Sequence, residues 1–327
     1  MVSRQTYDAL SYLDAQDPYG KACCWLPRGA APATALEQLV LHIAEHDLQR
    51  ARQGAACDLR DITGFEWWLQ VRRPADGMPF HHDTNWADAD QGFADFSFAA
   101  CSSATYLSDA GGPLVVLDGP NAVPSAGSAA TGSDWRSAYE RQLNETIRAS
   151  AHAGGHVFIP RFGKHVAFSG AAYHGVLDDA VLRRADEQPQ SGSGERMALV
   201  VAYWSQPMRH VRRFPRELFA SHLRARQARR AAAGSDAPAD EARDREAWAM
   251  LSLLEPPPWE TWTRLRAAEC AAEDTQLAAA EREEAPLTVV RTGDAVTKQR
   301  FALRLPSALE PGAFVRVPDV ALEMLDA

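Results

Sequence analysis

Short runs typical of extended strands recur between residues 65 and 204, and the first of them alternates between apolar and polar residues. In the first run, Phe65, Trp67 and Leu69 fall on one side of the chain, which is the period of a strand with one buried face. Turn-forming sequences such as DAGG at 109–112 separate several of the runs. The pattern predicts an antiparallel sandwich or barrel, and a jelly roll (double-stranded β-helix) is the simplest closure for eight strands. The expected strands lie at 65–72, 78–83, 102–108, 113–117, 156–160, 164–168, 173–177 and 196–204.

A helical pattern precedes these strands. Thr34 and Glu37 have the spacing of a capping box, and the apolar residues that follow, up to residue 51, recur at helical intervals. We expect this segment to be an amphipathic helix that backs the sheet. Residues 1–208 are therefore expected to form one domain, mainly β with α, in which N-terminal helices support a jelly-roll core.

Other segments interrupt or follow the predicted core. Residues 118–154 begin as a loop rich in Pro, Gly, Ser and Ala and continue into a predicted helix. After Trp204 the pattern becomes mostly helical, so residues 209–327 are expected to form a helical C-terminal extension. The Ala/Arg/Asp-rich stretch near 230–244 is expected to be partly disordered, and a further helix is expected at about 259–284. The sequence near the C-terminal end is compatible with a small hairpin.

Composition narrows the class of protein. With 46% hydrophobic and 24% charged residues the chain has an ordinary globular composition, and no apolar run approaches the ~18 residues of a bilayer span. The N-terminal residues lack the apolar core of a secretory signal, so we expect a cytoplasmic protein. Five cysteines without CxxC spacing indicate reduced thiols rather than disulfides or a zinc site. A net charge of −9 and a pI near 5.6 argue against a nucleic-acid partner.

The segment FHHDTNW at 80–86 carries the main chemical signal. On a strand, His81 and Asp83 point to the same side, so one short element presents an imidazole and a carboxylate to one metal ion. His174, on a later predicted strand, is the candidate third ligand. Two histidines and one carboxylate form the facial triad of non-heme Fe(II) sites, which leaves positions open for a keto acid and O2. The alternative is a hydrogen-bonded pair of His81 and Asp83 at a sheet edge.

Four stretches of the chain resemble the Fe(II)/2-oxoglutarate-dependent dioxygenase superfamily, in particular its prolyl-hydroxylase-like branch. The stretches are HHD at 81–83, TYLSDAGGPLVVL at 105–117, GKHVAFSGAAYHGV at 163–176 and RMALVVAYW at 196–204, and together they cover roughly residues 65–205. The resemblance implies a jelly-roll oxygenase whose catalytic iron is bound by His81, Asp83 and His174. It also implies a basic residue, after the last of these ligands, that binds the far carboxylate of 2-oxoglutarate.

Two arginines are candidates for that basic residue. Arg184 is closer to the family's usual spacing but stands in a segment with the composition of a loop. Arg196 begins a predicted strand, a rigid element that can aim a guanidinium at a carboxylate, so it is preferred. Tyr106 is a second candidate contact to 2-oxoglutarate, with an ordinary core tyrosine as the alternative. Asn85 and Trp204 are candidate substrate contacts, and a core position is the alternative for Trp204.

The resemblance implies an enzyme that uses Fe(II), 2-oxoglutarate and O2, with ascorbate as a further candidate cofactor, and releases succinate and CO2. The expected substrate is a protein side chain, as for prolyl hydroxylases, or a small metabolite, and neither nucleic acid nor membrane is expected as a partner. Two alternatives stay open. One is a catalytically silent jelly-roll binding module, and the other is a cupin-like metalloenzyme that does not use 2-oxoglutarate. The sequence gives no indication of the oligomeric state.

Overall fold

The structure, a computed structural model, consists mainly of antiparallel strands. It describes residues 23–53, 57–72, 77–85, 97–118, 154–178, 195–208, 211–232, 287–294, 299–306, 314–317 and 320–324, and the single positions 245, 248 and 251. By internal contacts the chain divides into two compact units, residues 1–71 with 199–272 and residues 72–198 with 273–327. Among the described residues, no helix is both long and apolar enough to cross a membrane.

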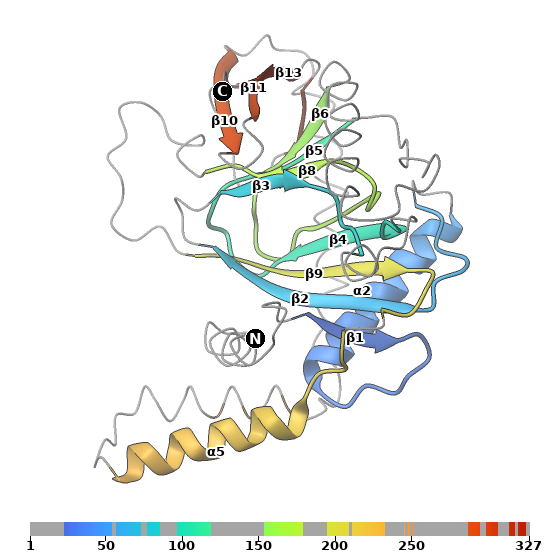
Figure 1. Ribbon diagram of the computed structural model, residues 1–327, viewed down its shortest axis with the longest axis vertical. Coiled ribbons are helices and arrows are strands. Elements are labelled where there is room, and N and C mark those ends of the chain that lie inside the picture. Colours follow the sequence, from blue (N-terminus) through green and yellow to red (C-terminus); the bar gives the residue numbers. More distant parts are fainter. Residues whose placement is uncertain are drawn as a thin grey trace, which may run out of the picture. The chain divides into compact units, whose positions relative to one another are not determined.

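Within the described residues, the first unit contains three neighbouring strands and two helices, α2 (Ala35–Arg52) and α5 (Arg216–Ala232) (Figure 1). The strands, in the order β1-β2-β9, are β1 (Cys24–Pro27), most of β2 (Gly64–Arg72) and most of β9 (Arg196–Trp204). β1 and β2 are antiparallel, with Cys24 opposite Trp67. The edge of the Phe65 ring meets the Tyr203 ring at a centroid distance of 5.5 Å, so β2 and β9 share a buried aromatic contact.

Helix α2 (Ala35–Arg52) of the first unit begins with the predicted capping pattern. The backbone N–H of Glu37 donates to Thr34 Oγ1 at 3.2 Å, and the Glu37 carboxylate accepts from the N–H of Ala33 at 2.6 Å. Glu37 is fully buried, and its carboxylate also pairs with the Arg213 guanidinium at 2.8 Å. The predicted helix is confirmed, and its first turn is held by a buried carboxylate that also binds the segment preceding helix α5 (Arg216–Ala232).

The second unit contains the central strands of the chain. They are β3 (Met78–His81), β4 (Cys101–Tyr106), β5 (Leu114–Leu117), β6 (Gly155–Phe158), β7 (His165–Phe168) and β8 (His174–Val176). β6, β5, β8 and β3 are neighbours in one sheet, while β4 pairs with β7 (Figure 1). A hydrophobic core joins side chains from these two groups, including Tyr106 of β4, Val116 of β5 and Val176 of β8. Strands from both groups therefore contribute to one interior.

Each of the eight predicted strands corresponds to a strand of the structure, β2 to β9, with small shifts at the ends. The prediction succeeded because short apolar runs bounded by turn-forming sequences are a local signal of strands. Strand β1 was missed, since its four residues Cys24–Pro27 are too few to show a period. The predicted helix in the 118–154 insertion lies outside the described residues.

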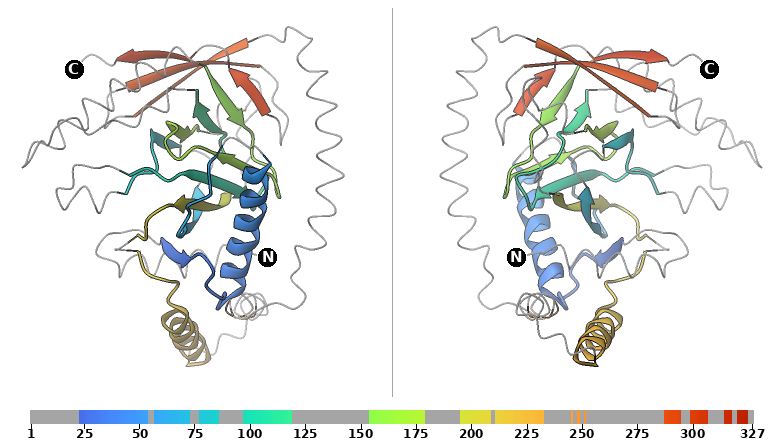
Figure 2. Two further views of the ribbon diagram at one scale, coloured as in Figure 1. Left: turned by 90° about the vertical axis from the view of Figure 1, so that its right-hand side faces the viewer. Right: turned by 90° about the vertical axis from the view of Figure 1, so that its left-hand side faces the viewer.

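The C-terminal strands belong to the second unit, and Figure 2 shows them in red at one end of it. They are β10 (Leu287–Asp294), β11 (Gln299–Pro306), β12 (Phe314–Val317) and β13 (Val320–Met324). β10 and β11 form the hairpin expected from the sequence, and β13 adds to β11. β12 instead pairs with β6, where the Phe314 ring stacks on His156 at 5.3 Å. The expected helix at 259–284 and most of the stretch 230–244 lie outside the described residues, and the domain boundary at 208 stays a prediction.

Candidate metal centre

His81 and His174 are directly opposite each other on neighbouring antiparallel strands. β3 pairs with β8 in a register that places His81 against His174, and their ring centroids are 4.4 Å apart. Opposed residues of an antiparallel pair project to the same face of the sheet, so both imidazoles face the same space. Gly175 permits this close approach, because a Cβ atom there would lie 2.8 Å from the Phe80 ring and 3.0 Å from the carbonyl oxygen of Met78.

Asp83 completes the group from the residues that follow β3. Its carboxylate oxygens lie 3.8 Å from His81 Nε2 and 3.7 Å from His174 Nε2. The Asp83 backbone is held on both sides, since its N–H donates to the carbonyl of Gly170 at 3.2 Å and its own carbonyl accepts from Ala99 N–H at 3.1 Å. The three potential ligand atoms all lie within 4.8 Å of one another, so one ion can be bound by all three side chains.

The protonation state of the His174 imidazole suits a metal ligand. Burial is the main cause that lowers the pKa of His174 to about 4; the neighbouring His81 also lowers it, and the Asp83 carboxylate opposes the shift. The imidazole is therefore neutral near pH 7. Its Nδ1 lies 3.0 Å from the carbonyl oxygen of Ala172, an acceptor that requires the proton on Nδ1 and leaves the Nε2 lone pair for a metal ion. The His174 side chain is 5% exposed against 35% for His81, so the open side of the group lies nearer His81.

Ser102 contacts the carboxylate of this group, and the sequence analysis missed it. Its hydroxyl donates to Asp83 Oδ2 at 2.5 Å, and Ser102 is fully buried on β4. The bond restrains the carboxylate and leaves Oδ1 nearer His81. A signal was present, because Ser102 and the candidate Tyr106 have the same parity on one strand and so face the same side.

Arg196 is a buried cation beside Tyr106. The side chain is 1% exposed at the start of β9, and its guanidinium carbon lies 5.2 Å from the centroid of the Tyr106 ring. Burial raises the pKa of Tyr106, and the positive charge of Arg196 opposes this shift. Tyr106 packs in the hydrophobic core with Val176, which shares a face of β8 with His174 because side chains alternate along a strand. Arg196, Tyr106 and the candidate metal-binding group of His81, Asp83 and His174 therefore border the same interior.

Comparisons with known proteins add little to this geometry. No family model matches the chain, and no curated protein matches it. Among solved structures the chain is similar to a prolyl-4-hydroxylase from Pseudomonas putida, with 17% identity over 61% of this chain and 88% of that one, and a TM-score of 0.29. This TM-score is too low to identify a shared fold, so any functional conclusion depends on the residues of the site.

The remaining candidate residues have other surroundings. Asn85 is 6% exposed two positions after Asp83, and its N–H donates to the carbonyl of Ser97 at 3.1 Å. Trp204 lies in the first unit, where its indole N–H donates to Glu66 Oε2 at 3.1 Å. Arg184 lies outside the described residues. The roles of these three in substrate or co-substrate binding stay predictions.

Two further histidines lie outside the group. His82 is buried, its Nδ1 lies 2.9 Å from the carbonyl oxygen of Ala171, and burial is the main cause that lowers its pKa to about 4. His165 Nδ1 lies 2.8 Å from the Thr105 hydroxyl. His82 is the middle residue of the motif HHD, and its ring contacts Phe98 and Tyr173, while the candidate ligand group consists of His81, Asp83 and His174.

Proposed function

We propose that this protein is an Fe(II)- and 2-oxoglutarate-dependent dioxygenase with a double-stranded β-helix core. The observation that supports it is the pairing of a compact group of His81, Asp83 and His174 with a fully buried arginine that borders the same interior. A metal site alone would fit many hydrolases and binding proteins. A buried guanidinium beside it is suited to a carboxylate of an organic acid.

The three side chains are suitable ligands for iron. Two imidazoles and one carboxylate are the donor set of non-heme Fe(II) centres, and they leave further coordination positions for co-substrate and O2. Iron held there would supply O2 activation for hydroxylation, coupled to conversion of 2-oxoglutarate to succinate and CO2. The chain's own contribution is orientation: the Ala172 carbonyl orients His174, and Ser102 restrains Asp83.

Arg196 is the residue proposed to bind the far carboxylate of 2-oxoglutarate. A guanidinium that is 1% exposed gains a great deal from a carboxylate partner, because burial has removed most of its contact with water. Tyr106 would form the wall under the co-substrate and exclude water from it. O2 and, as a further candidate, ascorbate complete the proposed cofactors. The proposed substrate is a protein side chain or a small metabolite in the cytoplasm.

The decisive experiment is an anaerobic titration of the Fe(II)-loaded protein with 2-oxoglutarate, followed by the visible charge-transfer band of a chelated keto acid. Wild type should develop the band, and His174→Ala should lose it. Arg196→Met, which keeps the side-chain volume, should raise the 2-oxoglutarate concentration needed by about tenfold or more, since bonds to charged groups are worth roughly 1.5–3 kcal/mol. His156→Ala is the control, because His156 pairs with Asp118 at 2.9 Å outside the group.

Other results would identify the alternatives. A folded protein that binds Fe(II) without any response to 2-oxoglutarate would point to a cupin-like metalloenzyme. A folded protein that binds no metal would point to a silent binding module. With O2 present, release of succinate that depends on both iron and His174 would complete the case for the oxygenase.

A further inference from the structure

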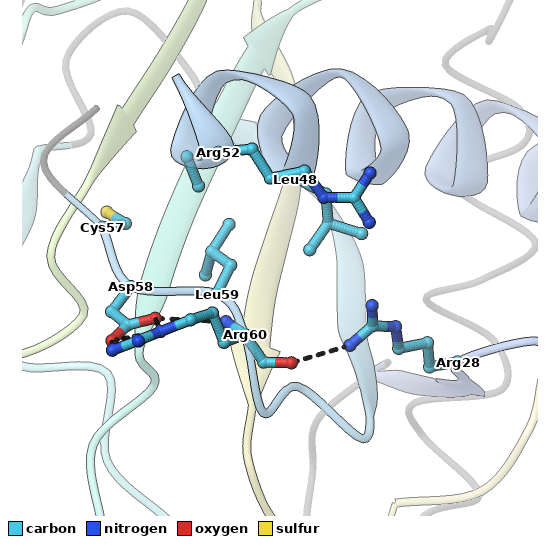
Figure 3. Close-up of a pocket in the computed structure, with 8 residues that line it drawn as sticks. Arg28, Leu48, Arg52, Cys57, Asp58, Leu59 and Arg60 are labelled. Atoms are coloured by element: carbon cyan, nitrogen blue, oxygen red, sulfur yellow. Dashed lines mark hydrogen bonds and ion pairs between the residues drawn. The ribbon is translucent and has the colours of Figure 1, made fainter. Parts of the chain in front are cut away.

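A surface hollow in the first unit is lined by three arginines and one aspartate. Its volume is about 650 Å³, and its lining comes from the end of α2, from Arg28 after β1, and from the segment before β2. The lining residues are Arg28, Leu48, Ala51, Arg52, Cys57, Asp58, Leu59 and Arg60 (Figure 3). The hollow is thus positively charged in a chain whose net charge is −9.

One of the three arginines, Arg60, forms an ion pair with the aspartate of the same lining, Asp58. Arg60 Nε donates to Asp58 Oδ1 at 2.9 Å, and its Nη2 donates to Oδ2 at 2.5 Å. Figure 3 shows this pair at one side of the hollow, with the Arg28 and Arg52 guanidinium groups at the other. The aspartate is therefore engaged by Arg60, and two positive charges stay available to a ligand.

Arg28 is held in place by backbone acceptors. Its Nη1 donates to the carbonyl oxygens of Arg60 at 3.2 Å and Ile62 at 3.1 Å. These neutral acceptors orient the guanidinium without neutralising its charge. Because the side chain is already ordered, ligand binding costs less conformational entropy. Within the described part of the chain, no carboxylate forms an ion pair with Arg28.

Arg52 supplies the second positive charge. It stands in the last turn of α2, and it too has no carboxylate partner among the residues that the structure describes. The carbonyl ends of α2 carry a partial negative charge, equivalent to roughly half an elementary charge, and they oppose an anion. Two uncompensated guanidinium groups outweigh that charge.

Leu48, Ala51 and the buried Leu59 give the hollow an apolar part beside the two guanidinium groups. An inorganic anion would pair with the two guanidinium groups and leave the apolar surface in contact with water. A ligand that carries an oxyanion on an apolar body would use both, because burial of the apolar part adds about 25 cal/mol per Å² to the electrostatic attraction.

We propose that this hollow binds a small molecule carrying a carboxylate or phosphate group on an apolar body. Arg28 and Arg52 contact the oxyanion, and Leu48 and Leu59 contact the apolar body. This site is separate in its residues from His81, Asp83, His174 and Arg196, so it does not depend on the proposed oxygenase activity.

Cys57 provides a local readout, since it is reduced, half-buried and part of the lining. The full-length protein is alkylated with iodoacetamide in the presence of phenyl phosphate, benzoate or inorganic phosphate, and Cys57 modification is followed by peptide mass spectrometry. Half-buried Cys23 lies outside the lining and serves as the internal reference. Phenyl phosphate or benzoate should protect Cys57 saturably at millimolar concentrations, and inorganic phosphate should protect it less.

Arg52→Gln and Arg28→Gln should each raise the half-protecting concentration by about fivefold, the upper range for exposed ion pairs. Arg50→Gln is the matched control, because Arg50 stands in the same last helical turn outside the lining and should change nothing. If Arg28→Gln perturbs folding, Arg52→Gln still decides the result. Protection by phenyl phosphate alone assigns a phosphate ester, and protection by benzoate alone assigns a carboxylate. No protection by either, or an equal effect of Arg50→Gln, overturns the proposal.

Discussion

Gly111 lies directly against Arg196. A Cβ atom on Gly111 would lie only 2.2 Å from the Cβ atom of Arg196, and Gly111 has a φ of +96°. Space and backbone conformation therefore both require glycine at this position. On the same loop, the Ser108 hydroxyl accepts from the N–H of Met197 at 2.8 Å. The loop between β4 and β5 thus fixes the start of β9 and with it the path of the buried guanidinium.

Gly111→Ala should displace Arg196 and weaken 2-oxoglutarate binding. The new methyl group cannot fit without a shift of the Arg196 backbone, and a residue forced into such a φ costs of order 1–3 kcal/mol. The measurement is the anaerobic titration of the iron-loaded variant, together with its thermal unfolding midpoint. We expect weaker co-substrate binding with Fe(II) binding retained.

Gly29→Ala is the matched control for this change. Gly29 has a similar φ of +81°, but nothing lies within 4 Å of the position its Cβ would take. It should show the backbone strain without the collision. Equal losses of 2-oxoglutarate affinity in both variants would mean that strain, and not the position of Arg196, causes the effect.

Ser102→Ala should weaken metal binding. Without the hydroxyl, Asp83 Oδ2 loses its 2.5 Å hydrogen bond and the carboxylate can rotate away from the two imidazoles. Loss of a partner that orients a ligand typically costs about 10- to 100-fold in metal affinity. Competitive titration with Co(II), a spectroscopic substitute for Fe(II), measures the change independently of activity.

Ser103→Ala is the control for that titration. Ser103 is equally buried on the same strand but faces the other side, and its hydroxyl makes no hydrogen bond within the described residues. It should leave Co(II) affinity unchanged. If Ser103→Ala weakened Co(II) binding as strongly as Ser102→Ala, a general loosening of β4 would explain both.

Metal binding should stabilise the folded protein. A ligand that binds only the native state adds about 2.7 kcal/mol at one hundred times its dissociation constant. Co(II) should therefore raise the thermal unfolding midpoint of wild type, and a chelator should reverse the rise. His174→Ala should show no rise, whereas His156→Ala should behave as wild type. A rise that persists in His174→Ala would place the ion elsewhere.

The buried carboxylate at the start of α2 should be a main determinant of stability. Thr34→Ala removes the cap and should cost about 1 kcal/mol. Glu37→Ala should cost more, because it leaves the Ala33 N–H without its acceptor and the Arg213 guanidinium without its carboxylate partner. Chemical denaturation measures both. Glu45→Gln, at an exposed position of the same helix, should change the free energy of unfolding by less than about 0.5 kcal/mol.

Local pattern predicted much of the fold and part of the site. The alternation at 65–72 located β2, short extended runs between turn-forming sequences located β3 to β9, and the spacing of Thr34 and Glu37 located the start of α2. The motif HHD predicted that His81 and Asp83 share one site, and the structure brings their side chains together, while His82 Nδ1 lies against the Ala171 carbonyl. These features need only the neighbouring residues, because the period of a strand or a helix is a property of the local backbone.

Tertiary structure alone decided which distant residues meet. The register of β3 and β8 puts His174 opposite His81, and the Ser102 hydroxyl reaches Asp83 from another strand. The contact of Gly111 with Arg196 likewise joins segments far apart in the sequence. Such contacts follow from strand order and register, which are selected by the packing of the whole core, and no local period in the sequence records them.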